Sequence, residues 1–287
     1  MTLIIILIAL GLDYFVGGLG RFREFNWFIS LHYYLEKRLA HYKYWDGTAG
    51  LIVLLVLPLL GIFLLLEFAG HYAWIVEAVL TLIVLIYCLS PENLDSRLDE
   101  YITAINADDT DAQAKLEAQL INDDLLDEDD DNELAVIKST FIESHKRTFA
   151  VLFWFLVLGA VGALLYRLVE HLHAELKEIR SGFADSNHLL LGVLEWPSTR
   201  LMVIGLALGG NLVEALPDWK KSEHFSFEVN DDVLIKSGLG ALQYLPAIAV
   251  PDRDASYWID EIKSLINRTL IIWLAILGIM TLSGKLG

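Results

Sequence analysis

The chain has 287 residues, 55% of them hydrophobic, and a mean hydropathy of +0.49. This apolar share exceeds that of a typical soluble domain, so a membrane protein is expected. The 38 acidic residues against 21 basic ones exclude the basic surface of a nucleic-acid-binding protein. The single cysteine, Cys88, excludes an intrachain disulfide and a multi-cysteine metal site.

The hydrophobicity is concentrated in six segments. Segments of about 17 to 25 apolar residues can cross the hydrocarbon core as helices. These lack the two-residue alternation of barrel strands, so helices are predicted. The segments are residues 3–19, 48–66, 72–89, 149–166, 201–216 and 269–284.

Some segments carry polar residues. Asp13 lies in the first, Glu77 in the third, and Asn211 and Glu214 weaken the fifth. No Lys or Arg precedes the first segment and no small-residue cleavage pattern follows it, so we expect a retained helix rather than a signal peptide. A carboxylate at the centre of a span costs roughly 2.5 to 3.5 kcal/mol, so Asp13 and Glu77 should face a partner or a water-filled cavity, unless Glu77 lies near the interface.

A strongly acidic insert follows the third segment. Residues 91–147 contain seventeen acids and five bases. Apolar residues recur there at three- and four-residue steps, which predicts short amphipathic helices. Asp108, Asp109, Thr110 and Asp111 form an expected N-cap region before one of them.

The charges of the loops predict the orientation. The loop 21–43 holds five basic residues and 69–71 holds no Lys or Arg, so the first loop and the acidic insert are expected in the cytoplasm. Arg167, Lys177 and Arg180 would then lie outside if 201–216 crosses back, and a re-entrant or surface arrangement would remove this conflict.

The predicted fold is all-α: a multi-pass helical membrane protein of the bacterial inner membrane, with four to six transmembrane helices and a helical cytoplasmic insert. The expected domains are 1–90, N-terminal transmembrane helices; 91–147, the insert; and 148–287, a C-terminal membrane domain. The last contains a polar helical segment, 217–268, in which spaced apolar residues predict one further helix.

Two sequence blocks resemble a known superfamily. Residues 153–167 read FWFLVLGAVGALLYR, and residues 194–201 read LEWPSTRL. These blocks, with DEYITAINADDTDAQAKLEAQLI in the insert, are similar to the AmpE family within the AmpE and CobD/CbiB superfamily. In the family's tandem the proline stands one place later than Pro197 does here.

The resemblance implies an inner-membrane signalling or accessory protein linked to cell-wall stress and β-lactamase induction, whose acidic insert meets a protein partner. The CobD relatives imply an alternative, an enzyme that condenses an amine with a corrinoid carboxylate. The Glu-Asn-Thr run of those relatives is missing here, because His145, Lys146 and Arg147 follow Glu143 and Ser144. No complete catalytic motif is present, so the sequence leaves open whether the chain is an enzyme and names no cofactor.

Arg167 closes one apolar segment and Arg200 opens the next. Both could be charges that snorkel to the headgroup level. Arginine also binds phosphate and carboxylate in a bidentate manner, so an anionic lipid or a muropeptide is a candidate ligand beside the membrane lipids. We predict one shared pocket for these residues, which requires a bend at Gly159 or Gly162, or re-entry. The candidate ligand-binding residues are Asp13, Glu143, Arg167, Glu195, Arg200, Asn211 and Glu214.

Three other kinds of site are not expected. Asp127, Asp129 and Asp131 imitate the start of a calcium loop, but Asn132 and Lys138 replace its glycine and glutamate. Residues 278–286 miss the spacing and hydroxyl of a nucleotide-binding loop. The eight histidines are scattered, so no metal site is predicted.

Overall fold

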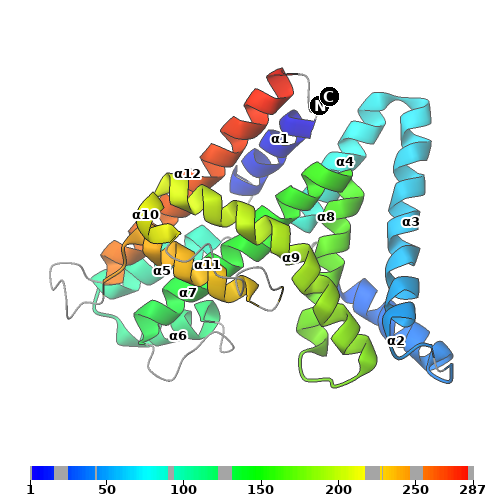
Figure 1. The fold of residues 1–287 in the computed structure, drawn as a ribbon, viewed down its shortest axis with the longest axis horizontal. Coiled ribbons are helices and arrows are strands. Elements are labelled where there is room, and N and C mark those ends of the chain that lie inside the picture. The colour runs from blue at the N-terminus through cyan, green and yellow to red at the C-terminus, as the bar shows by residue number, and fades with distance from the viewer. Residues whose placement is uncertain are drawn as a thin grey trace. The chain divides into compact units, whose positions relative to one another are not determined.

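The computed structural model describes residues 2–15, 25–42, 44–89, 94–121, 131–216, 227, 229–245 and 255–283. All regular elements in these ranges are helices, so the all-α prediction is confirmed (Figure 1). The chain divides into two compact units, each described by itself. The first unit comprises residues 1–92 and 147–197, and the second comprises residues 93–146 and 198–285.

The first unit is built on an apolar helical hairpin. Helices α3 (Thr48–Tyr72) and α4 (Trp74–Cys88) are joined at Ala73, which has extended backbone (Figure 1). Helix α1 (Thr2–Phe15) packs on α4, and α2 (Asn26–Leu39) packs on α3 and α8. Much of α3 leaves its apolar side chains uncovered by protein, as expected for a helix that faces lipid.

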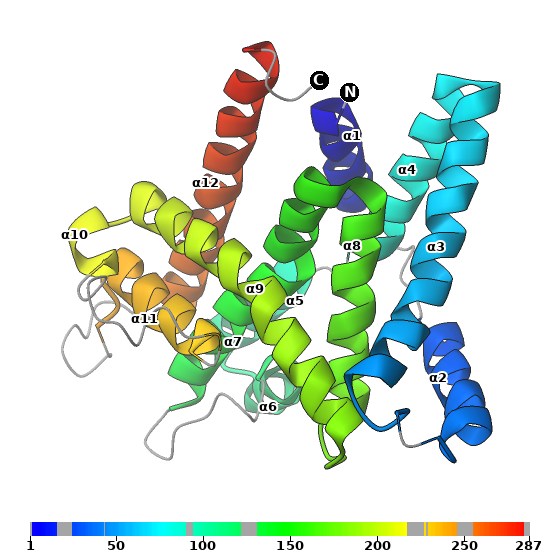
Figure 2. The ribbon, with the colours of Figure 1, turned by 45° about the vertical axis from the view of Figure 1, so that its right-hand side comes forward.

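Helix α8 (Ala150–Leu176) is broken at Gly159. Its φ of 66° and ψ of −155° are non-helical, in a region that favours glycine. A Cβ on Gly162 would lie 2.3 Å from the carbonyl oxygen of Trp154, eight residues earlier, which is impossible in a straight helix. The chain therefore reverses at this break, as Figure 2 shows.

Of the bends at Gly159 or Gly162 that a shared pocket would require, the structure has the one at Gly159. The prediction of one straight crossing over residues 149–166 was wrong, because a backbone that only glycine adopts easily interrupts it. Arg167 lies on the returning arm, and Lys177 and Arg180 follow it. If the insert is cytoplasmic, as predicted, a returning arm would remove the charge conflict with the positive-inside rule.

Helix α9 (Gly182–Gly209) differs from the crossing predicted for the fifth apolar segment. The expected crossing over 201–216 is instead the end of this 28-residue helix, followed by a break and the short α10 (Leu212–Ala215). The break occurs because the backbone N–H of Asn211 donates to Ala241 O at 2.9 Å, and Asn211 then caps α10. The helix passes from the first unit to the second between Pro197 and Ser198.

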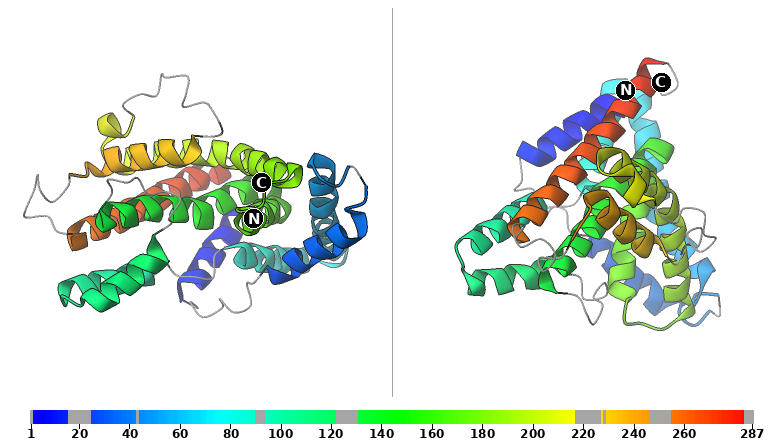
Figure 3. Two further views of the ribbon diagram at one scale, coloured as in Figure 1. Left: turned by 90° about the horizontal axis from the view of Figure 1, so that it is seen from below. Right: turned by 60° about the vertical axis from the view of Figure 1, so that its left-hand side comes forward.

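The second unit contains the described part of the acidic insert. Helices α5 (Leu94–Asn106) and α6 (Thr110–Leu120) lie side by side in the right-hand view of Figure 3. Asp109 caps α6 by accepting from Ala112 N at 3.0 Å, which confirms the predicted N-cap region. Helix α7 (Asn132–Ser144) packs on α6 and on two helices from the end of the chain, α11 (Asn230–Leu242) and α12 (Ala255–Leu282). The further helix expected within 217–268 is thus present as α11.

Four helical stretches of the described residues are long and apolar enough to cross a membrane: α3, the stretch Asn132–Leu176 that Gly159 breaks, α9 and α12. Helices α1 and α4 are apolar but have only 14 and 15 residues. Residues 21–24 and 43 of the first loop, residues 122–130 and residues 217–226 lie outside the described residues. The expected domain boundaries and the orientation therefore stay predictions.

Candidate functional site

A π-helix joins α7 to α8. It covers His145–Phe149. Such segments add a residue to the helical turn, are rare, and occur frequently at functional sites. Ser144, the last residue of α7, and His145, the first of the π-helix, are buried at 5% and 1% exposure. The segment therefore turns polar side chains inward at the end of the insert.

His145 contacts two hydroxyl groups of α9. Its Nε2 lies 2.9 Å from Ser198 Oγ and 3.3 Å from Thr199 Oγ1. All three side chains are at most 1% exposed. A histidine beside a serine can activate a nucleophile, but these groups are closed to a substrate from water. Their contact instead fixes α9 against the end of α7.

Two cations of the second unit reach the start of α11. Arg200 Nη1 donates to Asn230 Oδ1, and both side chains are buried. The adjacent Asp231 lies 3.9 Å from Lys146 Nζ. Within the part of the chain that the structure describes, no side chain caps α11, and its first N–H groups point toward the same end. Backbone donors at a helix start, together with Arg and Lys, suit an anion, which would have to displace Asp231 from Lys146.

Arg167 of the first unit has a different role. Its Nε donates to Cys88 O at 2.8 Å, and its Nη1 donates to Glu170 Oε2 at 3.0 Å. Cys88 is the last residue of α4, so Arg167 supplies a donor and a positive charge where that helix leaves carbonyls unpaired. Arg167 is 7% exposed, and its Nη2 is buried with no partner among the described residues.

The comparisons with known proteins now identify the family. The sequence matches the family described as "CobD/Cbib protein" over residues 6–177, more than half of the chain. The chain belongs to the CobD/Cbib family. The matched region includes α7, the π-helix and both arms of α8. With its apolar helices, this CobD/Cbib chain is a membrane protein.

One relative is the Cobalamin biosynthesis protein CobD of Chromobacterium violaceum. It is 31% identical over 116 residues, which cover 38% of this chain and 36% of that protein. The match therefore spans about a third of the relative. No solved structure matches the chain. The narrower AmpE assignment is not shown by these comparisons and stays a prediction.

The other candidate residues of this CobD/Cbib chain are dispersed. Glu195, buried in the first unit, accepts a hydrogen bond from Tyr166 Oη at 3.3 Å. Asp13, on α1, and Glu143, on α7, are half-buried. Asn211 accepts from Val213 N and Glu214 N, and Glu214 itself is exposed.

The single pocket for all seven candidates stays a prediction. Its members Asp13, Arg167 and Glu195 belong to the first unit, while the other four belong to the second. Sequence reasoning missed the contact of His145 with Ser198 and Thr199, which lie more than fifty residues further along the chain. No sequence periodicity links these three residues, so no pattern in the sequence predicts that their side chains meet.

Glu77 lies beside a cavity, while its alternative interpretation, a position near the interface, stays a prediction. It lines a cavity of 390 Å³ in the first unit, together with Glu67, Trp74 and Gly159. A carboxylate in an apolar helix was expected to face a partner or such a cavity. Among the described residues, no three His, Cys, Asp or Glu side chains gather closely enough to hold a metal ion.

Proposed function

We propose that the chain is a multi-pass inner-membrane enzyme of the CobD/Cbib type, which forms an amide between an amine and an anionic, carboxylated substrate at the cytoplasmic face. Family membership supports this proposal. The observation that carries it is the convergence of Lys146 and Arg200 on the uncapped start of α11. That arrangement would bind the carboxylate or another anionic group of the substrate.

Amide formation needs an activated carboxyl group. In the proposed reaction ATP transfers a phosphoryl group to the carboxylate oxygen, and ADP leaves. The amine then attacks the carbonyl carbon and loses a proton, the new C–N bond forms, and phosphate departs. Arg200 and Lys146 would hold negative charge on the substrate during these steps, which is the ordinary contribution of such cations.

The experiment uses the full chain in liposomes with ATP, Mg²⁺, a primary amine and a corrinoid that has free carboxylates. Mass spectrometry should detect the amide product. Arg200→Ala should lower kcat/KM by at least about tenfold, because it removes a charged hydrogen-bond donor worth roughly 1.5 to 3 kcal/mol. Lys236→Ala, which removes an exposed cation of α11, is the matched control and should retain turnover.

The CobD protein of Chromobacterium violaceum serves as the reference. Turnover by that protein, with none by this chain under the same conditions, would sink the enzymatic proposal. Equal losses in Arg200→Ala and Lys236→Ala would show that the α11 site is not involved.

A second candidate function is AmpE-type signalling, with the acidic insert as the surface for a protein partner. One observation favours it: the Glu-Asn-Thr run of CobD enzymes is missing, because Ser144 and His145 follow Glu143, and both are buried. Deletion of the gene should then alter β-lactamase induction while leaving corrinoid synthesis unchanged. The reverse pattern would support the enzyme.

A further inference from the structure

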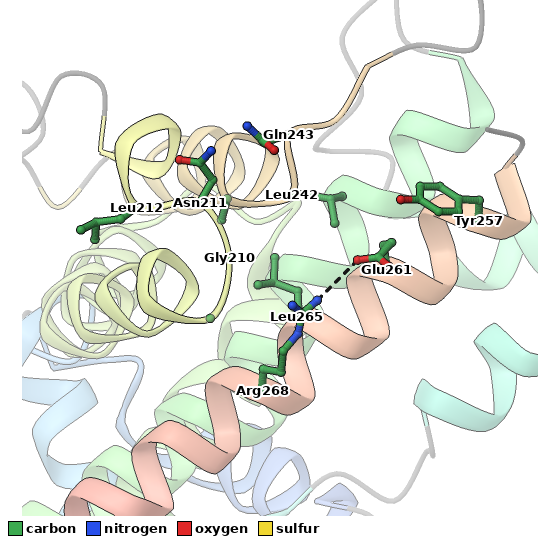
Figure 4. A pocket seen from close by; sticks show the side chains of 11 residues that line it. Gly210, Asn211, Leu212, Leu242, Gln243, Tyr257, Glu261, Leu265 and Arg268 are labelled. Carbon is green, nitrogen blue, oxygen red and sulfur yellow. Dashed lines mark hydrogen bonds and ion pairs between the residues drawn. The ribbon is translucent and has the colours of Figure 1, made fainter. Parts of the chain in front are cut away.

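The second unit contains a cavity of 540 Å³ whose lining includes Asn211 but none of Lys146, Arg200 and Asn230 (Figure 4). Three helix regions form its walls: the break after α9, the end of α11 and one face of α12. The polar groups that line it are Asn211, Gln243, Tyr257, Glu261 and Arg268.

Backbone contacts hold the opening of this cavity. The N–H of Asn211 donates to Ala241 O at 2.9 Å, and a Cβ on Gly210 would lie 2.4 Å from the same oxygen. Helix α11 ends at Gln243 with a φ of 53°, in the left-handed region. The side-chain amides of Asn211 and Gln243 therefore project from neighbouring, fixed stretches of backbone, as Figure 4 shows.

Two opposite charges line the cavity. Glu261 Oε2 and Arg268 Nη2 of α12 are 3.4 Å apart, and their side chains are 41% and 47% exposed. An exposed pair of this kind contributes little to stability. Its two groups can therefore turn to a ligand that offers each of them an opposite charge.

Arg268 marks a change along α12. Asp260, Glu261, Lys263 and Arg268 lie in its first half, whereas residues 269–282 contain no Asp, Glu, Lys or Arg. This uncharged part would extend about 21 Å at 1.5 Å per residue. If α12 enters the membrane there, Arg268 and the cavity lie at the depth of the lipid headgroups.

We propose that this cavity binds the headgroup of a zwitterionic phospholipid that carries a primary ammonium group, as in phosphatidylethanolamine. The phosphate accepts hydrogen bonds from Arg268 and from the amides of Asn211 and Gln243. The ammonium donates to Glu261. A purely anionic lipid would pair with Arg268 but meet Glu261 as a like charge, and a choline headgroup has no N–H to donate.

This site is more than a snorkelling arginine. Snorkelling needs one long cationic side chain at the interface and no acid, amide or cavity beside it. It would also show no preference for the ammonium headgroup. Glu261 is therefore the residue that separates the two explanations.

The test measures lipid retention by native mass spectrometry of the full chain in detergent, exchanged against equal amounts of phosphatidylethanolamine, phosphatidylcholine and phosphatidylglycerol. Phosphatidylethanolamine should be retained preferentially. Glu261→Gln and Arg268→Gln should each weaken that retention about tenfold, as expected for the loss of one charged hydrogen bond. Lys236→Gln, which breaks the exposed ion pair with Asp232, is the control and should leave retention unchanged.

Equal retention of the three lipids would overturn the proposal, as would stronger retention of phosphatidylglycerol. Competition by soluble phosphoethanolamine at the concentration of the lipid would assign the site to a soluble ligand instead. Circular dichroism should show the same helicity for every variant. If Arg268→Gln fails to fold, Glu261→Gln decides alone, since an unchanged headgroup preference in that variant would refute the site.

Discussion

Helices α3 and α7 use apolar residues for opposite purposes. In α3, Leu57 and Leu60 are each 50% exposed, although the helix is almost entirely apolar. In α7, Ile137 and Phe141 are fully buried, as are polar residues such as Thr140. The first pattern suits contact with lipid and the second suits packing against protein on all sides. Burial, more than hydrophobicity, therefore distinguishes the two helices.

The largest effect should come from truncating the core of α7. Phe141→Ala removes a fully buried ring and should cost about 3 to 5 kcal/mol, the transfer and cavity terms together. Leu57→Ala on α3 should change stability far less, because half of that side chain lies outside the protein. The thermal midpoint of the full chain in detergent measures both. Equal shifts would contradict the comparison.

An introduced charge should be tolerated less well on α3 than on a helix of the second unit. Leu60→Arg places a guanidinium near the middle of α3, where insertion costs roughly 2.5 to 3.5 kcal/mol, so the fraction integrated into membranes should fall. Gln119→Arg, on the exposed face of α6, should have no such effect. Alkaline extraction of membrane vesicles reports the integrated fraction. Full integration of Leu60→Arg would argue that α3 faces protein or water.

The sequence predicted the helices that form because of local periodicity, composition or capping residues. Periodicity and composition indicated α3, α7 and α11, and the aspartates before α6 indicated its start. The reversal of α8 was foreseen only as a required bend, because glycine permits a positive φ without demanding it.

The candidate functional site was harder to predict from such local patterns. Arg200 was a candidate, but its partner Asn230 is thirty residues away and lies in a separate helix. The π-helix has no sequence period of its own, so His145 was read as a departure from a motif rather than as a buried contact. Glu170, three residues after Arg167 on one helix, could have been found from spacing alone.

A smaller effect is expected at the start of α7. Asp131 Oδ1 accepts from Leu134 N at 2.8 Å and so caps the helix. Asp131→Ala should cost about 1 kcal/mol, whereas Asp131→Asn should retain the cap. The thermal midpoint compares the two. A stabilisation by calcium that Asp131→Asn abolishes would show that this aspartate is a metal ligand after all.

The smallest effect concerns a buried histidine of the first unit, His32 on α2. Burial lowers its pKa below the ordinary 6.5, although Glu36 and Glu175 act in the opposite direction. The unfolded chain therefore takes up a proton at a higher pH than the folded chain does. This contribution to stability is present above about pH 6.5 and is lost as the pH falls below that value.

The thermal midpoint should consequently fall between pH 7.5 and pH 5.5, and His32→Gln should reduce that fall. His41→Gln, at an exposed position close to the end of the same helix, is the control. Since burial is the first cause of the lowered pKa, the difference between these two variants isolates it from the net charge of the chain. An identical pH dependence in both variants would mean that His32 is as well hydrated as His41, which its 4% exposure contradicts.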